Sequence, residues 1–320
     1  MRSFWAIAII CLTVVCNSLY AAGGQEVTFM PDDPIQIVVP ASEGGGSDIV
    51  AKAIMDTMKH TQLVPTPFIV VHKPGGSGSA AIAYANGRPD PNHTLFVANT
   101  SHLLRMYANS HQMALTPIVR LAEDPILLVV PADSEYTTFE EFVGGSHDHE
   151  ILIGTADILD RYCVLQLKRE IEGDLRSVYY NGASFIVDGM VYGQLDGGIL
   201  NPSEARSGLE SGNLRVLVAF SDIPQSKLIP KTETLSELGY NGLDLRFSRY
   251  VMGPQGMADD VVDYWSSIFS KMSQSSYWLQ QYITPGDLQA AFLDSQGTQT
   301  FLVESELPWL DLILAEGLLD

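Results

Sequence analysis

The feature that most constrains the fold is a short apolar run that leads through a glycine-rich turn into a helical pattern. The run Pro34–Pro40 is followed by the turn 41–48, and apolar residues then recur at helical spacing over Ile49–His60. A short apolar run between prolines predicts a buried strand. Ser47 or Asp48 is the expected N-cap of the helix. The segment therefore predicts a strand whose carboxyl end opens through small residues into a helix.

The same succession recurs along the chain. A second glycine turn, Lys73–Ser79, follows a predicted strand at Phe68–Val71. Strands that alternate with helices predict mainly parallel sheets flanked by helices, an α/β fold. Further strands are predicted at Thr94–Ala98, Ile126–Val130, Ile151–Gly154, Arg176–Tyr180, Gly197–Leu200 and Leu214–Phe220, and helices at Ala80–Asn86, Ile158–Ile171, Phe185–Tyr192 and over most of the chain from Asp259 onwards.

The turns at the ends of these strands are candidate binding loops. In open α/β sheets, ligands bind outside the carboxyl ends of the strands. A helix that starts there presents unpaired N–H groups and the positive end of its dipole, and glycine allows a ligand to approach the backbone closely. Such loops can hold an anion without lysine or arginine. Any single glycine could instead only close a tight turn, so the prediction rests on several such loops together.

The charge balance excludes several classes of partner. The chain has 320 residues with 18 Lys+Arg and 38 Asp+Glu, a net charge of −20. A nucleic-acid binder needs a basic face that displaces phosphate counterions, and an anionic lipid surface would repel this chain. No nucleic-acid partner is therefore expected. A small anionic ligand stays compatible with the charge, because the field in a pocket is set by the groups nearest to it.

The first 24 residues have the plan of a secretory signal peptide. Arg2 is followed by the apolar run Phe4–Val15 and then by small residues. This order of a basic, an apolar and a small-residue region predicts cleavage near Ala22 or Gly23. A retained membrane anchor is the alternative, but the apolar run is shorter than the roughly 20 residues that span a bilayer.

Cleavage would leave Cys163 as the only cysteine. An intrachain disulfide and a cysteine-based metal site are then excluded. Lipid attachment at Cys16 is a further alternative, although Val15 precedes it where a lipidation motif has a small residue. The sequence predicts a soluble, exported protein, which in a bacterium is periplasmic.

Motifs for catalysis or for cofactors are weak. The stretch Gly76–Ala81 fits the dinucleotide motif G-x-G-x-x-A loosely, but Asp90 comes too early for its acidic partner about 20 positions on. There is no G-x-S-x-G turn, no P-loop lysine and no visible set of nucleophile, base and orienting group. The run His147–His149 resembles a metal-binding fragment without a third ligand and is interpreted as a polar loop. We expect no cofactor, no metal site and no enzymatic activity.

The order of these segments resembles the extracytoplasmic solute receptors of tripartite tricarboxylate transporters, also called the Bug family. Each motif is weak alone, but their order and spacing over nearly the whole mature chain carry the resemblance. The matching stretches are 34–51, which holds the first glycine loop, 73–78, 90–97, 178–183 with 193–196, 233–240 and 253–256.

The resemblance implies a two-domain periplasmic binding protein that closes on its ligand like a clamshell. Domain 1 is expected at 25–129 plus 248–320 and domain 2 at 130–247, with the chain crossing between them near Leu127–Asp133 and Leu245–Val251. The implied partners are a small carboxylate, either an organic acid or an amino acid, and integral-membrane permease subunits. The mature protein is expected to be monomeric. A sensory co-receptor for a signalling kinase is an alternative that the sequence leaves open.

The resemblance also implies the ligand-binding residues. In the family, a carboxylate is held mainly by backbone N–H groups and hydroxyls of the loops, and Asp48 is expected to cap its helix rather than to touch the ligand. Carried over, the first domain contributes Ser42, Glu43, Gly44, Gly45, Gly76, Ser77, Gly78, Thr100 and Ser101, and the second domain Thr155, Ala156, Asp157, Tyr180, Asn181 and Asn201.

One stretch departs from the family. Where the family often has Ser-x-Gly-x-Gly-Ser, this chain has Thr155-Ala156-Asp157-Ile158-Leu159-Asp160, so both glycines are replaced and two carboxylates are added. One interpretation makes Asp157 or Asp160 a simple helix N-cap. The other has Asp157 facing the ligand, where it would repel a second carboxylate and favour an ammonium group.

Overall fold

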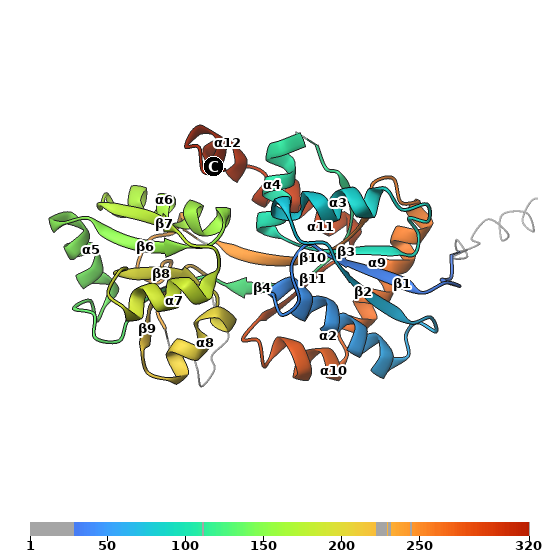
Figure 1. The fold of residues 1–320 in the computed structure, drawn as a ribbon, viewed down its shortest axis with the longest axis horizontal. Coiled ribbons are helices and arrows are strands. Elements are labelled where there is room, and N and C mark those ends of the chain that lie inside the picture. Colours follow the sequence, from blue (N-terminus) through green and yellow to red (C-terminus); the bar gives the residue numbers. More distant parts are fainter. Residues whose placement is uncertain (1–28, 111, 222–228, 230–231, 244, 320) are drawn as a thin grey trace, which may run out of the picture. The chain divides into compact units, whose positions relative to one another are not determined.

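The computed structural model describes residues 29–110, 112–221, 229, 232–243 and 245–319. These residues form two β-sheets, each flanked by helices, which confirms the predicted α/β class (Figure 1). The predicted signal peptide lies outside the described residues. Within the described ranges, no helix combines the length and the hydropathy that crossing a bilayer requires.

The first sheet contains β1 (Ile35–Val39), β2 (Phe68–His72), β3 (Thr94–Asn99), β4 (Leu115–Pro125), β10 (Arg246–Pro254) and β11 (Gln289–Leu293). Their order is β11-β4-β10-β3-β1-β2. β1, β2 and β3 are parallel, whereas β10 runs antiparallel to β3 and β4, and β11 antiparallel to β4. β4 therefore points the same way as β1 to β3, and only β10 and β11 oppose them.

The second sheet repeats this plan with β5 (Leu127–Pro131), β6 (Ile151–Thr155), β7 (Leu175–Tyr179), β8 (Gly197–Leu200) and β9 (Leu214–Ala219). The order is β7-β6-β8-β5-β9, and β5 alone runs antiparallel to its neighbours. In each sheet, three parallel strands are followed by one antiparallel strand next to a chain crossing. Most strands of each sheet point the same way, but both sheets are mixed, because β10 and β11 in the first sheet and β5 in the second run antiparallel to their neighbours.

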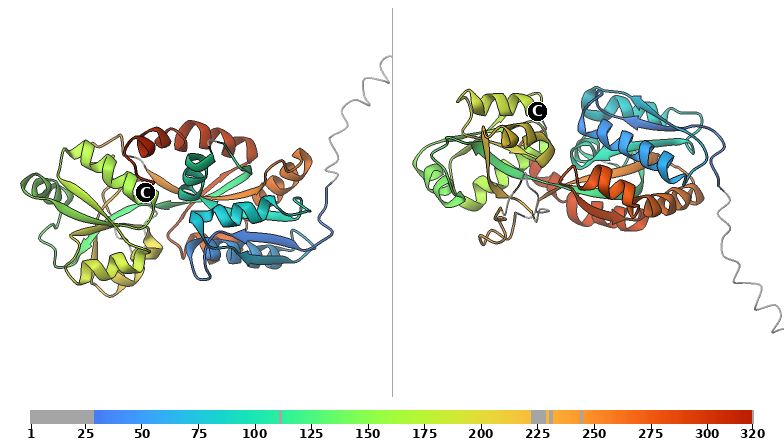
Figure 2. Two further views of the ribbon diagram at one scale, coloured as in Figure 1. Left: turned by 45° about the horizontal axis from the view of Figure 1, so that its top comes forward. Right: turned by 90° about the horizontal axis from the view of Figure 1, so that it is seen from below.

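Helices cover both faces of each sheet. Figures 1 and 2 show α6 and α7 on opposite faces of the second sheet. Alternate residues of β5 account for this: Leu128 and Val130 pack on the α6 side, and Leu127 and Val129 on the α7 side. The helices are α2 (Gly46–Thr61), α3 (Ser79–Asn86), α4 (Thr100–Ser110), α5 (Phe139–Asp148), α6 (Ile158–Ile171), α7 (Ala183–Val191), α8 (Pro202–Glu210), α9 (Asp259–Ser273), α10 (Ser276–Trp278), α11 (Ser295–Phe301) and α12 (Trp309–Ala315), with the short turns η1 (Gly76–Gly78), η2 (Leu279–Ile283) and η3 (Leu302–Glu306).

The structure corrects some local predictions. The N-cap of α2 is Gly45 rather than Ser47 or Asp48, so this helix begins earlier in the glycine loop. His147 does not lie in a loop, because α5 continues to Asp148. Gly145 lets the ring of Tyr136 pack closely against this helix, since an added Cβ there would lie 2.5 Å from the ring. Strands β4 and β11 were not predicted, and for β10 the resemblance implied only a strand end at 253–256.

The chain passes between the sheets twice, from β4 to β5 and from β9 to β10. The predicted domain boundaries stay a prediction. The end of the chain contacts helices that flank both sheets. Trp309 of α12 stacks on Tyr162 of α6, and the carbonyls of Leu318 and Leu319 accept hydrogen bonds from Arg161 of α6 and Arg105 of α4.

Candidate functional site

The predicted ligand-binding residues all follow parallel strands. β1 lies between β2 and β3, and β6 lies between β7 and β8, so the order of connection reverses at β1 and at β6. Ligands of open α/β sheets bind at such switch points, outside the carboxyl ends of the strands. Residues 42–45 follow β1, 76–78 follow β2, 100 and 101 follow β3, 155–157 end or follow β6, 180 and 181 follow β7, and 201 follows β8.

The first turn of α2 is not capped by a side chain. Gly45 occupies the N-cap position with an extended backbone and makes no side-chain hydrogen bond there. Gly44 is exposed, and the Gly45 N–H donates only a long bond of 3.3 Å to the Ser42 carbonyl. The first N–H groups of a helix lack partners within the helix. The first turn of α2 therefore has no side-chain cap, and ligand binding there stays a prediction.

Asp48 braces this loop from within α2. Its Oδ2 accepts the Gly44 N–H at 2.7 Å and lies 2.9 Å from Lys52 Nζ, while its Oδ1 lies 2.7 Å from His72 Nε2. Burial raises the pKa of Asp48, but the Gly44 N–H, Lys52 and His72 outweigh burial and lower the pKa to about 2. Asp48 thus stays ionised and orders the loop. Glu43 turns its side chain to Lys52 at 2.9 Å.

A residue that was not predicted, Arg249, lies against the same turn. It is 6% exposed, and its Nε lies 3.0 Å from Oδ1 of Asp124, with a second bond from Nη2 to Oδ2. An added Cβ at Gly46 would lie 3.2 Å from Arg249 Nη1. Burial lowers the pKa of Arg249, but Asp124 outweighs it, so the guanidinium is permanently charged. In the sequence, Arg249 could have been noticed as a charged residue next to the apolar stretch of β10.

The loop after β2 packs beneath α4. Gly78 has φ +98°, and an added Cβ there would lie 3.3 Å from the His102 ring. Burial, together with the positive charges of Arg249 and Arg105, lowers the pKa of His102 to about 4. His102 is therefore neutral at pH 7. The side chain of Ser77 is outside the described part of the structure.

The two predicted residues of α4 have different surroundings. The Thr100 hydroxyl is fully buried, donates to Glu306 Oε1 at 2.8 Å and accepts the Ser248 N–H at 2.8 Å. It therefore ties α4 to β10 and η3. The Ser101 hydroxyl is buried without a hydrogen bond of normal geometry in the described chain, and it lies close enough to Asp157 to lower the pKa of that carboxyl.

The first turn of α6 is occupied by the chain's own carboxylates. Asp157 is the N-cap and accepts the N–H groups of Leu159 at 2.8 Å and Asp160 at 3.1 Å. In return, Asp160 accepts the N–H groups of Ala156 at 2.8 Å and Asp157 at 3.2 Å. The prediction of an N-cap is confirmed. Because these four donors are used internally, this end of α6 is a poor place for a ligand carboxylate.

Negative charge gathers around the start of α6. Burial raises the pKa of Asp157 and of Asp160, and Asp157 and Glu204 raise that of Asp160 further. Although water reaches Glu204, surrounding protein removes enough hydration to raise its pKa to about 7, aided by Asp157 and Asp124. The positive charge of Arg249 lowers the pKa of Asp157 and of Glu204, although Asp124 already pairs with Arg249.

Of the remaining predicted residues, all but Asn181 contact the surrounding chain. Asn201 caps α8, and its Oδ1 accepts the Glu204 N–H at 3.0 Å and the Ser203 hydroxyl at 2.7 Å. The Tyr180 hydroxyl lies over α7, 3.2 Å from where a Cβ on Gly189 would be. Thr155 is buried and bonds Ser177 at 2.9 Å. Asn181 is exposed and open to a ligand.

The motif His147–His149 gathers no metal ligands. His147 Nε2 bonds the Ile171 carbonyl at 2.8 Å, and His149 Nε2 bonds the Tyr136 hydroxyl at 3.0 Å. Among residues 29–110, 112–221, 229, 232–243 and 245–319, no three His, Cys, Asp or Glu side chains form a group that could hold a metal ion.

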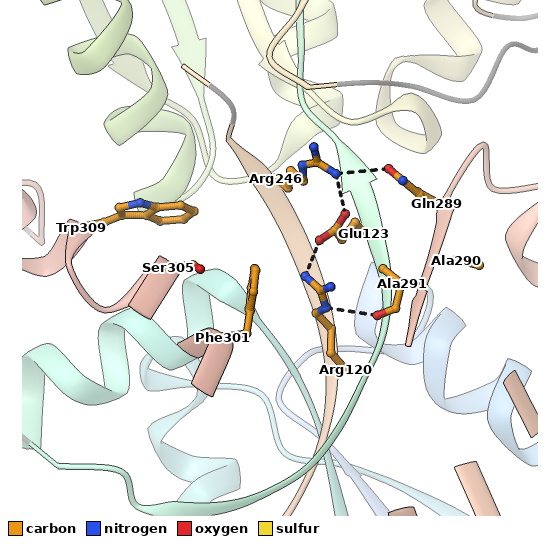
Figure 3. Close-up of a pocket in the computed structure, with 9 residues that line it drawn as sticks. All are labelled: Arg120, Glu123, Arg246, Gln289, Ala290, Ala291, Phe301, Ser305 and Trp309. Carbon is orange, nitrogen blue, oxygen red and sulfur yellow. Dashed lines mark hydrogen bonds and ion pairs between the residues drawn. The ribbon is translucent and has the colours of Figure 1, made fainter. Parts of the chain in front are cut away.

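A separate cavity of about 570 Å³ contains none of the predicted residues (Figure 3). It includes Glu123 of β4, whereas the neighbouring Asp124 pairs with Arg249. Consecutive strand residues point to opposite faces of a sheet. The cavity and the Arg249–Asp124 pair therefore lie on opposite faces of the first sheet.

Known proteins share this architecture. MatC of Rhodopseudomonas palustris, solved with bound malate, is 21% identical with a TM-score of 0.71 and covers 89% of this chain and 100% of its own. The R. palustris protein Rpa4515, solved with adipate, is 19% identical with a TM-score of 0.74 and covers 89% and 97%. These likenesses show the fold of two-domain periplasmic binding proteins.

A sequence relative and a family model extend the comparison. BugT of Bordetella pertussis is 20% identical over 298 residues, which covers 90% of each chain. The model described as "Tripartite tricarboxylate transporter family receptor" matches residues 50–318. Since this match covers most of the chain, the protein belongs to the tripartite tricarboxylate transporter receptor family, as its resemblance to Bug proteins indicated.

Proposed function

We propose that this protein is a periplasmic receptor that captures a small carboxylate and delivers it to a membrane permease. The observation that carries the proposal is the uncapped first turn of α2, which has the buried guanidinium of Arg249 beside it. Backbone N–H groups and the helix dipole there favour an anion, and Nη1 of Arg249, whose charge is shared with Asp124, lies beside them. A carboxylate is the anion that the family and its ligand-bound relatives suggest.

The ligand carboxylate is placed in the β1–α2 loop, at Ser42–Gly45. The loop after β2, Gly76–Gly78, and the Ser101 hydroxyl supply further donors. Asp48 serves indirectly, because it holds Gly44 and keeps the loop in shape. The net charge of −20 presents no obstacle, since these local donors set the field that the ligand meets.

The rest of the ligand meets a different environment in the second sheet. Asp157, Asp160 and Glu204 surround the start of α6 with acidic groups, and the N–H groups there are already used. We therefore assign a ligand with one carboxylate and a neutral or ammonium group at its other end. A second carboxylate would be repelled, so an amino acid or a hydroxy acid fits this chain better than a dicarboxylate.

Export and partnership follow the family pattern. The arrangement of residues 1–24 supports a cleaved signal peptide and a periplasmic location. A ligand that contacts both halves binds the closed state better, and closure would give the permease a signal that the receptor is loaded. Small-angle scattering with saturating ligand is expected to show a smaller radius of gyration.

Calorimetric titration tests the proposal. The panel contains small monocarboxylates, amino acids and dicarboxylates, together with the primary amide of each best binder as a control of equal size. We expect saturable binding of a carboxylate and about 100-fold weaker binding of its amide, because the amide lacks the charge that Arg249 and α2 recognise. Equal binding of the amide, or no carboxylate bound at millimolar concentration, would refute it.

A further inference from the structure

Residues 302–319, which follow α11, contact both halves of the molecule, each of which is one sheet with its flanking helices. Leu302 at the start of η3 is 1% exposed and belongs to the apolar cluster on one face of the first sheet. Leu310 and Ile313 of α12 are buried in the apolar cluster of the second sheet. Because burial of apolar side chains holds both contacts, this short stretch is fixed at one end to each half.

A buried carboxyl group anchors η3 to the first half. Glu306 is 1% exposed, and its Oε1 accepts the Thr100 hydroxyl at 2.8 Å. Thr100 begins α4, and its hydroxyl oxygen accepts the Ser248 N–H of β10 at 2.8 Å. If Glu306 moved away, buried polar groups would lose their partners, which costs free energy. Therefore η3 stays with α4 and β10.

The stretch after Pro308 is fixed to α6 instead. Trp309 of α12 stacks on Tyr162, with ring centres 5.6 Å apart and ring planes at 21°. Further along the chain, Arg161 Nη1 donates to the Leu318 carbonyl at 2.6 Å. Stacked aromatic rings attract each other beyond the effect of their buried area. Therefore α12 and the residues after it stay with α6.

Helix α4 also takes part in both apolar clusters. Leu103 packs in the cluster of the first sheet, whereas Leu104 packs in the cluster of the second sheet. In addition, Arg105 Nη1 donates to the Leu319 carbonyl at 3.0 Å. The two halves are therefore in contact through α4, α6 and α12.

The joint between the two anchors is short. Only Leu307 and Pro308 separate Glu306 from Trp309, and Figure 3 shows Ser305 and Trp309 on either side of this joint. An extended chain covers at most roughly 3.6 Å per residue, so the Cα atoms of the two anchors can lie no more than roughly 11 Å apart. A wider separation of the two halves at this point has to break one of the anchors.

We propose that residues 302–319 form a strap that limits how far the two halves of the protein separate. The chain passes between the sheets from β4 to β5 and from β9 to β10, and the joint at 307–308 is a further connection. Since the strap holds α4, α6 and α12 together, opening is a hinge motion about these helices. The strap thereby sets the range of distances between the loop after β1 and the start of α6.

The distance between two spin labels measures this separation. The labels are attached to the variants Asp56→Cys and Asp188→Cys, at exposed positions on α2 and α7. The protein is expressed from residue 25, and the native Cys163 is fully buried and therefore unreactive. The protein holds no ligand during the measurement, so the result does not depend on the proposed function.

Lengthening the joint is the first change. Six Gly and Ser residues inserted after Leu307 keep both anchors but add up to roughly 20 Å of reach. We expect a broader distribution of distances, with a mean that exceeds the wild-type mean by more than about 2 Å. The same insertion after Gly212, in an exposed turn within the second half, is the control and should leave the distribution unchanged.

Removing an anchor is the second change. Trp309→Ala loses the ring that stacks on Tyr162, whereas Trp309→Phe keeps an aromatic ring there. We expect longer distances in the first variant and wild-type distances in the second. The proposal is overturned if the insertion after Leu307 leaves the distances unchanged, if the insertion after Gly212 lengthens them equally, or if the two Trp309 variants give equal distances.

Discussion

Helices α2 and α6, which begin at the two switch points, share an aspartate at the same helical position, but the pKa values of the two aspartates are shifted in opposite directions. Each follows the first parallel strand of its sheet, and each carries an aspartate at its third helical position that accepts N–H groups from the loop before the helix. Asp48 has Lys52 and His72 beside it, and its pKa falls to about 2. Asp160 has Asp157 and Glu204 beside it, and its pKa is raised.

We infer from this difference that the residue at the N-cap decides what each helix end can bind. Gly45 leaves the first turn of α2 to a ligand, whereas Asp157 fills the first turn of α6 with the protein's own carboxylate. A pair of sites that could have held two carboxylates symmetrically is therefore expected to hold one. Five substitutions, with Gly45→Ala as a control, test this contrast, and they follow in order of the size of the expected effect.

Giving α2 the cap of α6 should remove carboxylate binding. Gly45→Asp places a carboxylate where the ligand's would sit, and the extended backbone of Gly45 suits an aspartate cap, so the fold should be kept or stabilised. We expect affinity to fall about 100-fold, because the donors are used and a like charge is added. In Gly45→Ala, the added Cβ meets only ordinary contacts of 3.4 and 3.5 Å, so affinity should fall less than about three-fold. Calorimetry that finds the two variants equal would contradict the model.

The two equivalent aspartates should have opposite effects on stability. Since the folded pKa of Asp48 lies below its unfolded value of 3.8, its carboxylate stabilises the protein above about pH 4 and loses this contribution as the pH falls through about 2. Asp48→Asn should cost up to about 2 kcal/mol at pH 7.

For Asp160 the sign is reversed. Its raised pKa means that ionisation destabilises the folded state above the unfolded value, and asparagine keeps an oxygen that accepts the Ala156 N–H. Asp160→Asn should therefore match or exceed the wild type in denaturant midpoint at pH 7. Urea melts at pH 3, 5 and 7 of both variants measure this, and a loss of stability of similar size in both would show that the two helix ends are alike.

Removing one charge from α6 should relax the preference for ligands with a single carboxylate. Asn can replace Asp157 as an N-cap, so Asp157→Asn changes charge with little change in structure. We expect dicarboxylate affinity to rise about 10-fold relative to the best singly charged ligand, as one like charge nearby is worth about 1 kcal/mol or more at this depth. A wild type that already binds a dicarboxylate tightly, with no gain in Asp157→Asn, would show that Asp157 does not face the ligand.

The smallest effect is expected from Glu204. With a pKa of about 7, it gains a proton as the pH falls from 8 to 6, so the region near α6 becomes less negative. Dicarboxylate affinity in the wild type should rise a few-fold over that range, and Glu204→Gln should flatten the change. The variant keeps a side-chain oxygen for the Asn201 N–H. Calorimetry at pH 6, 7 and 8 measures the slope, and an unchanged slope in Glu204→Gln would exclude this residue as its source.

Sequence patterns were sufficient to predict the elements whose apolar spacing and capping residues lie within the element itself. β1, β8 and α6 match their predicted ranges closely, because their apolar spacing and their capping residues are both local. β4 was not predicted because Arg120, Glu123 and Asp124 interrupt its apolar pattern. Two of these charged side chains form ion pairs with β10, Glu123 with Arg246 and Asp124 with Arg249. β11 was missed because it lies within a largely helical region.

The sequence pointed to the glycine loops of the candidate site, but not to the ion pair of Arg249 with Asp124 beside them. Glycine loops can be recognised from the sequence, because few other structures need so many small residues before a helix. Arg249 and Asp124 could not be assigned in the same way, because they are 125 positions apart and meet only through the pairing of β10 with β4. A single polar residue inside an apolar strand does not indicate which distant residue it will pair with.

The strands of the first sheet come from two stretches of the chain that flank the second sheet in sequence, and this has a consequence for the order of folding. All strands of the second sheet lie between Leu127 and Ala219, whereas the first sheet pairs Asn99 with Arg249 and needs β10 and β11 to be complete. Contacts that close long loops form late. An exported chain that emerges N-terminus first should therefore finish its second sheet before its first, and pulsed hydrogen exchange during refolding should protect β5 to β9 ahead of β3 and β10.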